Sequence, residues 1–284
     1  MNVAKSFSYI TQNPRWPGKM FKGSLLSAIP LVSALANGYQ IQTVRNILDG
    51  KQHPLPEWSN YGAFLYDGIK VTAAKYIVNG PVAIAGVILL ITDIVHGSRW
   101  LKLGLALITG NKIELTSLVA LILMTIIHFL FGVVLSLMLL TLPVMVLRCA
   151  QGASFLSLFN VFSHLRFIFA HFMPCFLTYV IAFLIASVFS SVASAIGASF
   201  IFIPLSLLIY AMGKFWRRLA WARTLGEAGL EDKQKAIRAG RLYGPPTAAS
   251  GGLVLAGLFG SFVFALLFVV VMLGIVDSLS NSTS

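Results

Sequence analysis

Two histidines in apolar surroundings are the residues of this sequence best suited to cofactor chemistry. His128 and His171 both fall inside long apolar segments. A histidine in such a place can ligate haem or chlorophyll, or relay protons. Our preferred interpretation is a neutral histidine that is hydrogen-bonded between helices, as polar side chains are in helical bundles. We therefore predict no cofactor, and keep haem or chlorophyll at His128 or His171 as the alternative.

A metal site is the second kind of chemistry to consider. His171 and Cys175 are four residues apart, so a continuous helix would place them on one face, within reach of one metal ion. However, Pro174 lies between them, and a structural zinc site needs four such ligands. The only other cysteine is Cys149, and the sequence contains no CxxC motif. We predict no metal site.

Acidic residues and nucleotide motifs give little support to an enzyme. All nine Asp and Glu residues fall in expected connectors, at expected helix ends or in the C-terminal tail. Carboxylates within membrane helices usually mark proton or ion pathways, and here none is expected. Gly-x-Ser-x-Gly and phosphate-loop motifs are also absent from the sequence. The sequence predicts a protein that is not an enzyme, and it disfavours ion-coupled transport.

The most distinctive chemical feature is a basic and aromatic segment that begins at residue 214. Basic residues next to a membrane attract anionic headgroups by about 1 kcal/mol each, and Trp favours the membrane interface. We predict that this segment is a lipid anchor and sets the orientation of the chain, with a specific lipid or protein-partner site as the alternative. The residues concerned are Lys214, Trp216, Arg217, Arg218, Trp221 and Arg223.

A second candidate contact is the short segment after His53-Pro54. Its residues are Leu55, Pro56, Glu57 and Trp58. Two prolines in three positions favour a rigid turn, which is our preferred interpretation. A docking loop for a partner is the alternative.

The composition shows what must position these residues. Of 284 residues, 57% are hydrophobic and 11% are charged, whereas soluble domains have about 25% charged residues. This composition indicates an integral membrane protein. The net charge of +12 favours contact with anionic lipids at the bilayer surface. It does not favour nucleic acid, because nucleic-acid binders are basic on a solvated face and are less apolar.

The spacing of charged residues predicts the membrane helices, because about 20 apolar residues are needed to span the hydrocarbon core. We expect a single all-α membrane domain over residues 1–284. The 47-residue charge-free run from Phe167 to Gly213 is too long for one span, so small residues in the 190s are expected to reverse the chain. The five predicted transmembrane helices are 76–92, 115–142, 170–191, 197–214 and 253–276.

The remaining segments are expected at the membrane surface. Residues 59–75 have the spacing of an amphipathic interfacial helix, 93–114 have an interfacial pattern, and 214–241 are expected to form a solvated basic loop. Residues 23–44 contain Pro30 and several polar residues, so we predict a re-entrant or broken helical hairpin. This topology places 18 Lys and Arg residues inside and 3 outside, with a cytoplasmic N-terminus and an outer C-terminus.

The sequence resembles a known family. The resemblance is carried by Leu55-Pro56-Glu57-Trp58, by Asp67-Gly68-Ile69-Lys70 and by shorter matches over about residues 20–220. The family is the bacterial and archaeal membrane family catalogued as domain of unknown function 4013. The resemblance implies a polytopic membrane protein, and it supplies no activity or site residues. We expect the protein to lie in the cytoplasmic membrane of a bacterium or archaeon.

These observations together predict a non-enzymatic integral membrane protein. We expect it to act as a subunit, scaffold or lipid-interacting component of a membrane complex, with other membrane subunits or a second copy as partners. Segments interrupted by Pro and Gly support the main alternative, a transporter or channel for a small or lipid-like solute. A pigment- or haem-binding subunit is the third hypothesis, and a lipid-modifying enzyme is the fourth.

Overall fold

The computed structural model of this chain describes residues 5–29, 32–109, 115–198 and 202–239. These residues are helical wherever they have regular secondary structure, and no strand occurs among them. The all-α fold class is therefore confirmed. The described chain divides into two compact units, one with residues up to 75 and from 140, and one with 76–139.

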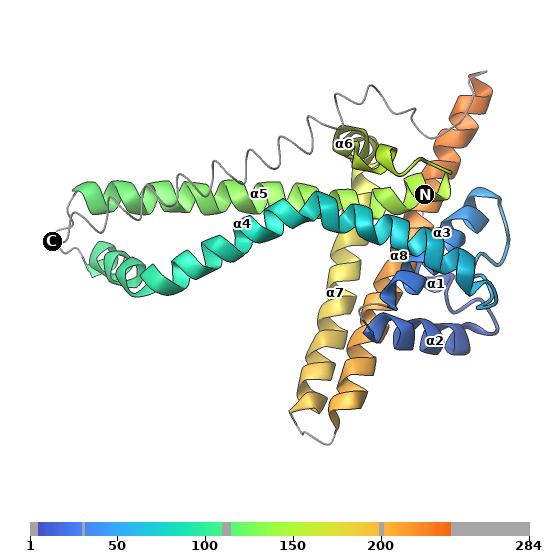
Figure 1. The fold of residues 1–284 in the computed structure, drawn as a ribbon, viewed down its shortest axis with the longest axis horizontal. Helices are drawn as coiled ribbons and strands as arrows, with labels where there is room; N and C mark the ends of the chain where they lie inside the picture. Colours follow the sequence, from blue (N-terminus) through green and yellow to red (C-terminus); the bar gives the residue numbers. More distant parts are fainter. Residues whose placement is uncertain (1–4, 30–31, 110–114, 199–201, 240–284) are drawn as a thin grey trace. The chain divides into compact units, whose positions relative to one another are not determined.

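The elements are drawn in Figure 1. They are α1 (Lys5–Ser8), α2 (Trp16–Ala28), α3 (Ser33–Leu48), α4 (Tyr61–Thr109), α5 (Leu115–Ala150), η1 (Leu156–Phe159), α6 (Val161–Ala170), α7 (Phe172–Gly197) and α8 (Ile203–Arg238). Both α4 and α5 begin or end in the first unit and continue into the second.

Helix α8 is the centre of the first unit, because α1, α2, α3 and α7 all pack against it. Helix α7 runs antiparallel beside α8, and α2 crosses α8 (Figure 1). The hydroxyls of Thr178 on α7 and Thr224 on α8 are 2.7 Å apart in the buried contact. Small residues such as Ala220 and Ala222 are fully buried on α8, which lets neighbouring backbones approach.

An aromatic cluster fills the core between α3, α4, α8 and the loop before α4. Tyr39 stacks on Trp58 with ring centroids 4.2 Å apart, and both rings also contact Phe64 and Phe215. Offset aromatic pairs of this kind stabilise a core beyond the area that they bury. The cluster fixes the loop that contains Trp58 relative to both helices.

Residues 23–44 form parts of two helices. Helix α2 ends at Ala28 and α3 begins at Ser33, so the interruption lies around Pro30. Proline removes a backbone donor and restricts the preceding residue, which explains why α2 stops there. Most of α3 is buried, including the polar side chains of Asn37 and Gln40.

Three helical segments are long and apolar enough to cross a membrane, among the residues described. They are Tyr61–Leu89, Thr125–Ala150 and Phe172–Gly197. This is fewer than the five that we predicted. The predicted span 253–276 lies outside the described residues, and 197–214 is not among the three.

The charge-based boundaries were wrong in two places. Residues 59–75, 76–92 and most of 93–114 do not form separate elements, because α4 runs without interruption from Tyr61 to Thr109 and contains Pro81. Lys70 does not mark a helix end, since its Nζ donates to the carbonyl oxygen of Ala153, 2.6 Å away. A charge bonded within the bundle is compatible with a continuous helix.

The predicted solvated loop 214–241 is mostly helix. Helix α8 continues to Arg238, and residues as far as Gly229 contribute to the core. The high count of Lys and Arg suggested a loop, but small and apolar residues between the charges form a buried stripe at helical spacing. Charge density alone did not distinguish a solvated loop from a long amphipathic helix.

The second unit contains the C-terminal part of α4 and the N-terminal part of α5. The two helices approach closely at Gly86, where an added Cβ atom would lie 3.1 Å from the ring of Phe131. Large apolar side chains of both helices face outward, including Ile84, Val87 and Phe129.

Candidate functional site

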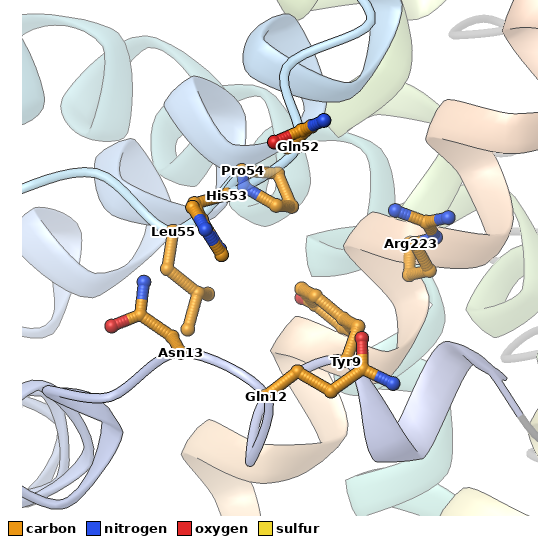
Figure 2. Close-up of a pocket in the computed structure, with 8 residues that line it drawn as sticks. All are labelled: Tyr9, Gln12, Asn13, Gln52, His53, Pro54, Leu55 and Arg223. Carbon is orange, nitrogen blue, oxygen red and sulfur yellow. The ribbon is translucent and has the colours of Figure 1, made fainter.

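A polar cavity of about 290 Å³ lies at one end of the first unit. It is enclosed by the segment after α1, the loop between α3 and α4, and α8 (Figure 2). Its lining residues are Tyr9, Gln12, Asn13, Gln52, His53, Pro54, Leu55 and Arg223. Figure 2 shows His53 and Leu55 on one side of the open space, and Tyr9 and Arg223 on the other.

Arg223 is the fixed cation of this cavity. Its Nε donates to Glu227 Oε1 over 2.6 Å, one helical turn along α8. Its guanidinium carbon lies 5.7 Å from the centre of the Tyr9 ring. Within the described residues its terminal nitrogens make no hydrogen bond, so they can donate to a ligand in the planar fork typical of arginine.

Tyr9 and Asn13 are held by bonds to the protein. The Tyr9 hydroxyl donates to the carbonyl oxygen of Leu219 over 2.9 Å. Burial raises the pKa of Tyr9 well above its usual value, so this phenol stays neutral. Asn13 Oδ1 accepts from the amide of Arg15, which leaves the Asn13 amide nitrogen free to donate. The cavity can thus bind a small polar or anionic molecule.

The segment Leu55 to Trp58 is held firmly by the core. The carbonyl oxygens of Leu55 and Pro56 accept from Lys19 Nζ and from the Tyr39 hydroxyl, at 3.0 and 2.9 Å. The Leu55 and Trp58 side chains are buried, and Trp58 Nε1 donates to the carbonyl oxygen of Lys19. Only Pro56 and Glu57 remain accessible to a partner, so this arrangement is that of a rigid turn.

Lys19 is a residue of this region that the sequence did not single out. Its side chain is buried, with the residue only 6% exposed, and its Nζ also contacts Glu57 Oε1 at 2.9 Å. A hydrogen bond from Lys19 lowers the pKa of the Glu57 carboxyl, with further contributions from the charges of Lys19, Arg15 and Lys22. In the sequence, Lys19 is one of several N-terminal cations, and only its spacing from Met20 and Gly23 hints at an inward face.

The basic and aromatic segment that begins at Lys214 does not form one patch. Trp221 is buried in the core, and Arg223 lines the cavity. Trp216 packs edge-on against Trp16, with ring centroids 6.3 Å apart. Lys214 Nζ lies over the ring of Tyr210.

The two adjacent arginines of this segment differ in their surroundings. Arg217 is exposed, whereas Arg218 donates to Ser27 Oγ over 3.0 Å. Burial, together with the charge of Arg217, lowers the pKa of Arg218 to about 10. The exposed Arg217 and the half-buried Lys214 are the members of this segment best placed for lipid headgroups, and that role stays a prediction.

An ion pair within the first unit corrects our placement of the acidic residues. Asp67 does not lie in a connector; it lies in α4 and accepts from Arg45 of α3. The other terminal nitrogen of Arg45 donates to the carbonyl oxygen of Cys149. The pair therefore joins α3, α4 and the end of α5.

Three histidines of the helical segments, His128, His164 and His171, have different environments. His128 is partly buried in α5. His171 lies between α6 and α7, with its Nε2 3.2 Å from Asp232 Oδ1. His164 is fully buried, and its ring nitrogens have no hydrogen-bond partner in the part of the chain that the structure describes.

Cys149 and Cys175 are free and buried. Among the described residues, no group of three or more His, Cys, Asp or Glu side chains could hold a metal ion. That neither His128 nor His171 binds a cofactor stays our prediction, with haem or chlorophyll as the alternative.

Comparison with known proteins identifies the family. The family model described as "Protein of unknown function (DUF4013)" matches residues 23–203. This is more than half of the chain, so the chain belongs to that family, and the resemblance noted from the sequence is confirmed. No curated protein and no solved structure matches the chain.

Proposed function

We propose that this family member is a non-enzymatic integral membrane protein that acts as a scaffold or lipid-interacting subunit of a membrane complex. The observation that carries the proposal is the outward face of α7. This helix packs against α8 through Thr178 and other small residues such as Ala182, which are buried. Its outward face carries exposed large apolar side chains. They are Phe172, Met173, Phe176, Leu177, Tyr179, Phe183, Leu184, Val188 and Val192.

A continuous apolar face of this length is unfavourable in water. Soluble monomers rarely expose apolar patches above a few hundred Å², and larger patches mark membrane or protein contacts. Helix α7 has 26 residues, which at about 1.5 Å per residue exceeds the hydrocarbon thickness of a bilayer. Lipid or a partner subunit is therefore the proposed environment of this face.

The packing behind α7 supports a scaffold role. The first unit combines the aromatic core at Tyr39 and Trp58 with the polar links Arg45–Asp67 and Lys19–Glu57. Links of this kind join elements that are far apart in sequence and so favour one fixed arrangement. A rigid unit that carries an apolar face is suited to holding a partner in a defined position.

The cavity in Figure 2 favours a second candidate function, a transporter or channel for a small solute. A volume of about 290 Å³ is near the lower end of the range for ligand pockets, and Arg223 supplies a charge for an anionic group. In this second candidate, the cavity is a solute site rather than a structural void.

Purification of the full chain in mild detergent separates the two candidates. The scaffold proposal expects the protein to elute with defined membrane partners, and α7 variants such as Phe176→Ser with Phe183→Ser to reduce that association. The matched control is Thr178→Ser, which keeps the buried hydroxyl. Recovery as a lone species that transports solute into liposomes, with transport lost in Arg223→Gln, would overturn the scaffold proposal in favour of the transporter.

A further inference from the structure

Helix α2 exposes large apolar side chains. Its buried side holds the polar residues Lys19, Ser24 and Ser27 beside Met20 and Gly23. On the outside, Phe21 is 54% exposed and Leu25 is 50% exposed, and Ile29 at the C-cap is 49% exposed. These three residues are four positions apart and form one ridge along the helix.

A groove of about 310 Å³ lies beside this ridge. Arg15, Gly18, Lys19 and Lys22 line it from α2 and its N-cap, and Glu57, Trp58 and Ser59 line it from the loop before α4. Three cations therefore face a single carboxylate. Arg15 and Lys22 are exposed, so they can contact a ligand without any rearrangement of the core.

Glu57 shows that the groove stabilises an anion. Its carboxylate bonds to Lys19, yet its side chain is 59% exposed, so it lies at the mouth of the groove and not in the core. Lys19 also bonds to the carbonyl oxygen of Leu55, which fixes this cation at the base. An anionic ligand that contacts Arg15 and Lys22 would be attracted by the same group of cations as the Glu57 carboxylate.

We propose that α2 lies in the membrane interface and that its groove binds the phosphate of an anionic phospholipid. Arg15 and Lys22 contact the phosphate, while Phe21, Leu25 and Ile29 enter the acyl-chain region. The inference deepens the proposed function and depends on it in one respect, that the chain resides in a membrane.

The combination of groove and ridge favours a lipid over a free phosphate. A soluble phosphate would use the cations but gains nothing from the three apolar side chains beside them. Interfacial helices bind membranes through buried apolar area together with attraction to anionic lipid, and α2 offers both on adjacent surfaces. The neighbouring Gly18, beside which an added Cβ would meet nothing within 4 Å, leaves room for a headgroup.

The test uses the detergent-solubilised full chain and a fluorescent phosphatidylglycerol probe. We expect unlabelled phosphatidylglycerol to compete with the probe far better than phosphatidylcholine or glycerol 3-phosphate. Arg15→Gln with Lys22→Gln should weaken probe binding by about thirtyfold, as expected for loss of two cations near a headgroup at about 1 kcal/mol each. The matched control is Lys235→Gln with Arg238→Gln in the exposed last turn of α8, which removes the same charge and should leave binding within twofold.

Two further variants test the roles of Glu57 and the ridge. Glu57→Gln should tighten probe binding, because it removes the competing carboxylate, whereas Asp49→Asn at an exposed position should not. Phe21→Ser with Leu25→Ser should weaken lipid binding without changing the weak competition by glycerol 3-phosphate.

Several results would overturn the inference. Equal losses in the two double-glutamine variants would show non-specific attraction to net charge. Competition by glycerol 3-phosphate as strong as that by the lipid would show a free-phosphate site. Extraction of the protein from membranes without detergent would instead contradict the proposed function, so the two failures are distinguishable.

Discussion

His164 is a buried side chain whose two ring nitrogens have no hydrogen-bond partner among the described residues. Burial, together with the nearby charge of Arg148, lowers its pKa to about 3. The imidazole is therefore neutral at ordinary pH. A buried polar group without a hydrogen bond normally costs free energy, so this position is a weak point of the first unit.

We predict that His164 makes stability depend on pH. The unfolded state binds a proton below the usual histidine pKa near 6.5, and the folded state does not do so until about pH 3. The free energy of unfolding is therefore unaffected by His164 protonation above about pH 6.5. It falls between about pH 6.5 and pH 3, by at most about 1.4 kcal/mol per pH unit for one proton. Thermal unfolding in detergent across this range measures the effect.

His164→Leu is the control for this dependence. It removes both the titrating group and the unpaired nitrogens, so we expect equal or higher stability at pH 7 and a smaller decline in acid. If the wild type and this variant lose stability in parallel as the pH falls, the other acid-sensitive groups dominate and the assignment to His164 is wrong.

Lys19 carries a second prediction at the level of single residues. Lys19→Met keeps the aliphatic stem but leaves the carbonyl oxygen of Leu55 without its donor and Glu57 without its ion pair. We expect a loss of about 1–3 kcal/mol in the free energy of unfolding. Lys22→Met, one turn further along the exposed side of α2, should change stability by less than about 0.5 kcal/mol. Denaturant unfolding of both variants makes the comparison, and equal effects would contradict a structural role for Lys19.

At the level of elements, α3 and α4 cross with their backbones in contact. A Cβ atom added to Gly38 would lie 1.8 Å from the carbonyl oxygen of Phe64, and one added to Gly68 would lie 1.8 Å from that of Ala34. Neither obstruction can move, because each is backbone. The two glycines are thus required by the approach of the helices and not by their own conformation.

We predict that Gly38→Ala or Gly68→Ala separates α3 from α4 and lowers the stability of the first unit by several kcal/mol, as overpacking and loss of the Arg45–Asp67 pair add together. Gly80→Ala in α4, where an added Cβ meets nothing within 4 Å, should instead stabilise the helix slightly. Thermal unfolding compares the three variants. A tolerated Gly38→Ala would mean that the helices do not touch there.

The elements also show what can be predicted from sequence. Pro30 falls between the end of α2 and the start of α3, as expected from its local effect. The predicted end of a span at residue 191 is six residues early, because Ser190, Ser191 and Ser194 are accommodated within α7, which ends at Gly197. The course of α8 could not be found from charges, because small and apolar residues between the charges form a buried stripe. The course of α4 could not be found from charges because Lys70 and Asp67 are bonded to partners far away in sequence. The cavity was missed for the same reason, since Tyr9, His53 and Arg223 come together only in the fold.

At the scale of the whole molecule, the composition predicts that the chain enters a membrane, and the charge bias predicts which way it faces. High apolarity agrees with the three long apolar helices of the described structure, which are compatible with a membrane protein. The predicted orientation depends on the Lys and Arg residues of 214–241, which was expected to be a loop. Most of these residues are helical, yet the exposed Lys235 and Arg238 still fall beyond the buried part of α8, so the inside assignment remains our prediction.

Cysteine labelling in intact cells tests this orientation. Cys149 and Cys175 are buried, so an introduced cysteine provides the main signal. Ile10 is fully buried and unsuitable, whereas Gln12 is exposed. We predict that Gln12→Cys and Lys235→Cys are protected from a membrane-impermeant maleimide and react only after permeabilisation, because the positive-inside bias places both on the cytoplasmic side. Ser280→Cys in the C-terminal tail should react in intact cells. Labelling of Gln12→Cys from outside, with Lys235→Cys still protected, would mean that α2 and α3 do not return to the side from which they start.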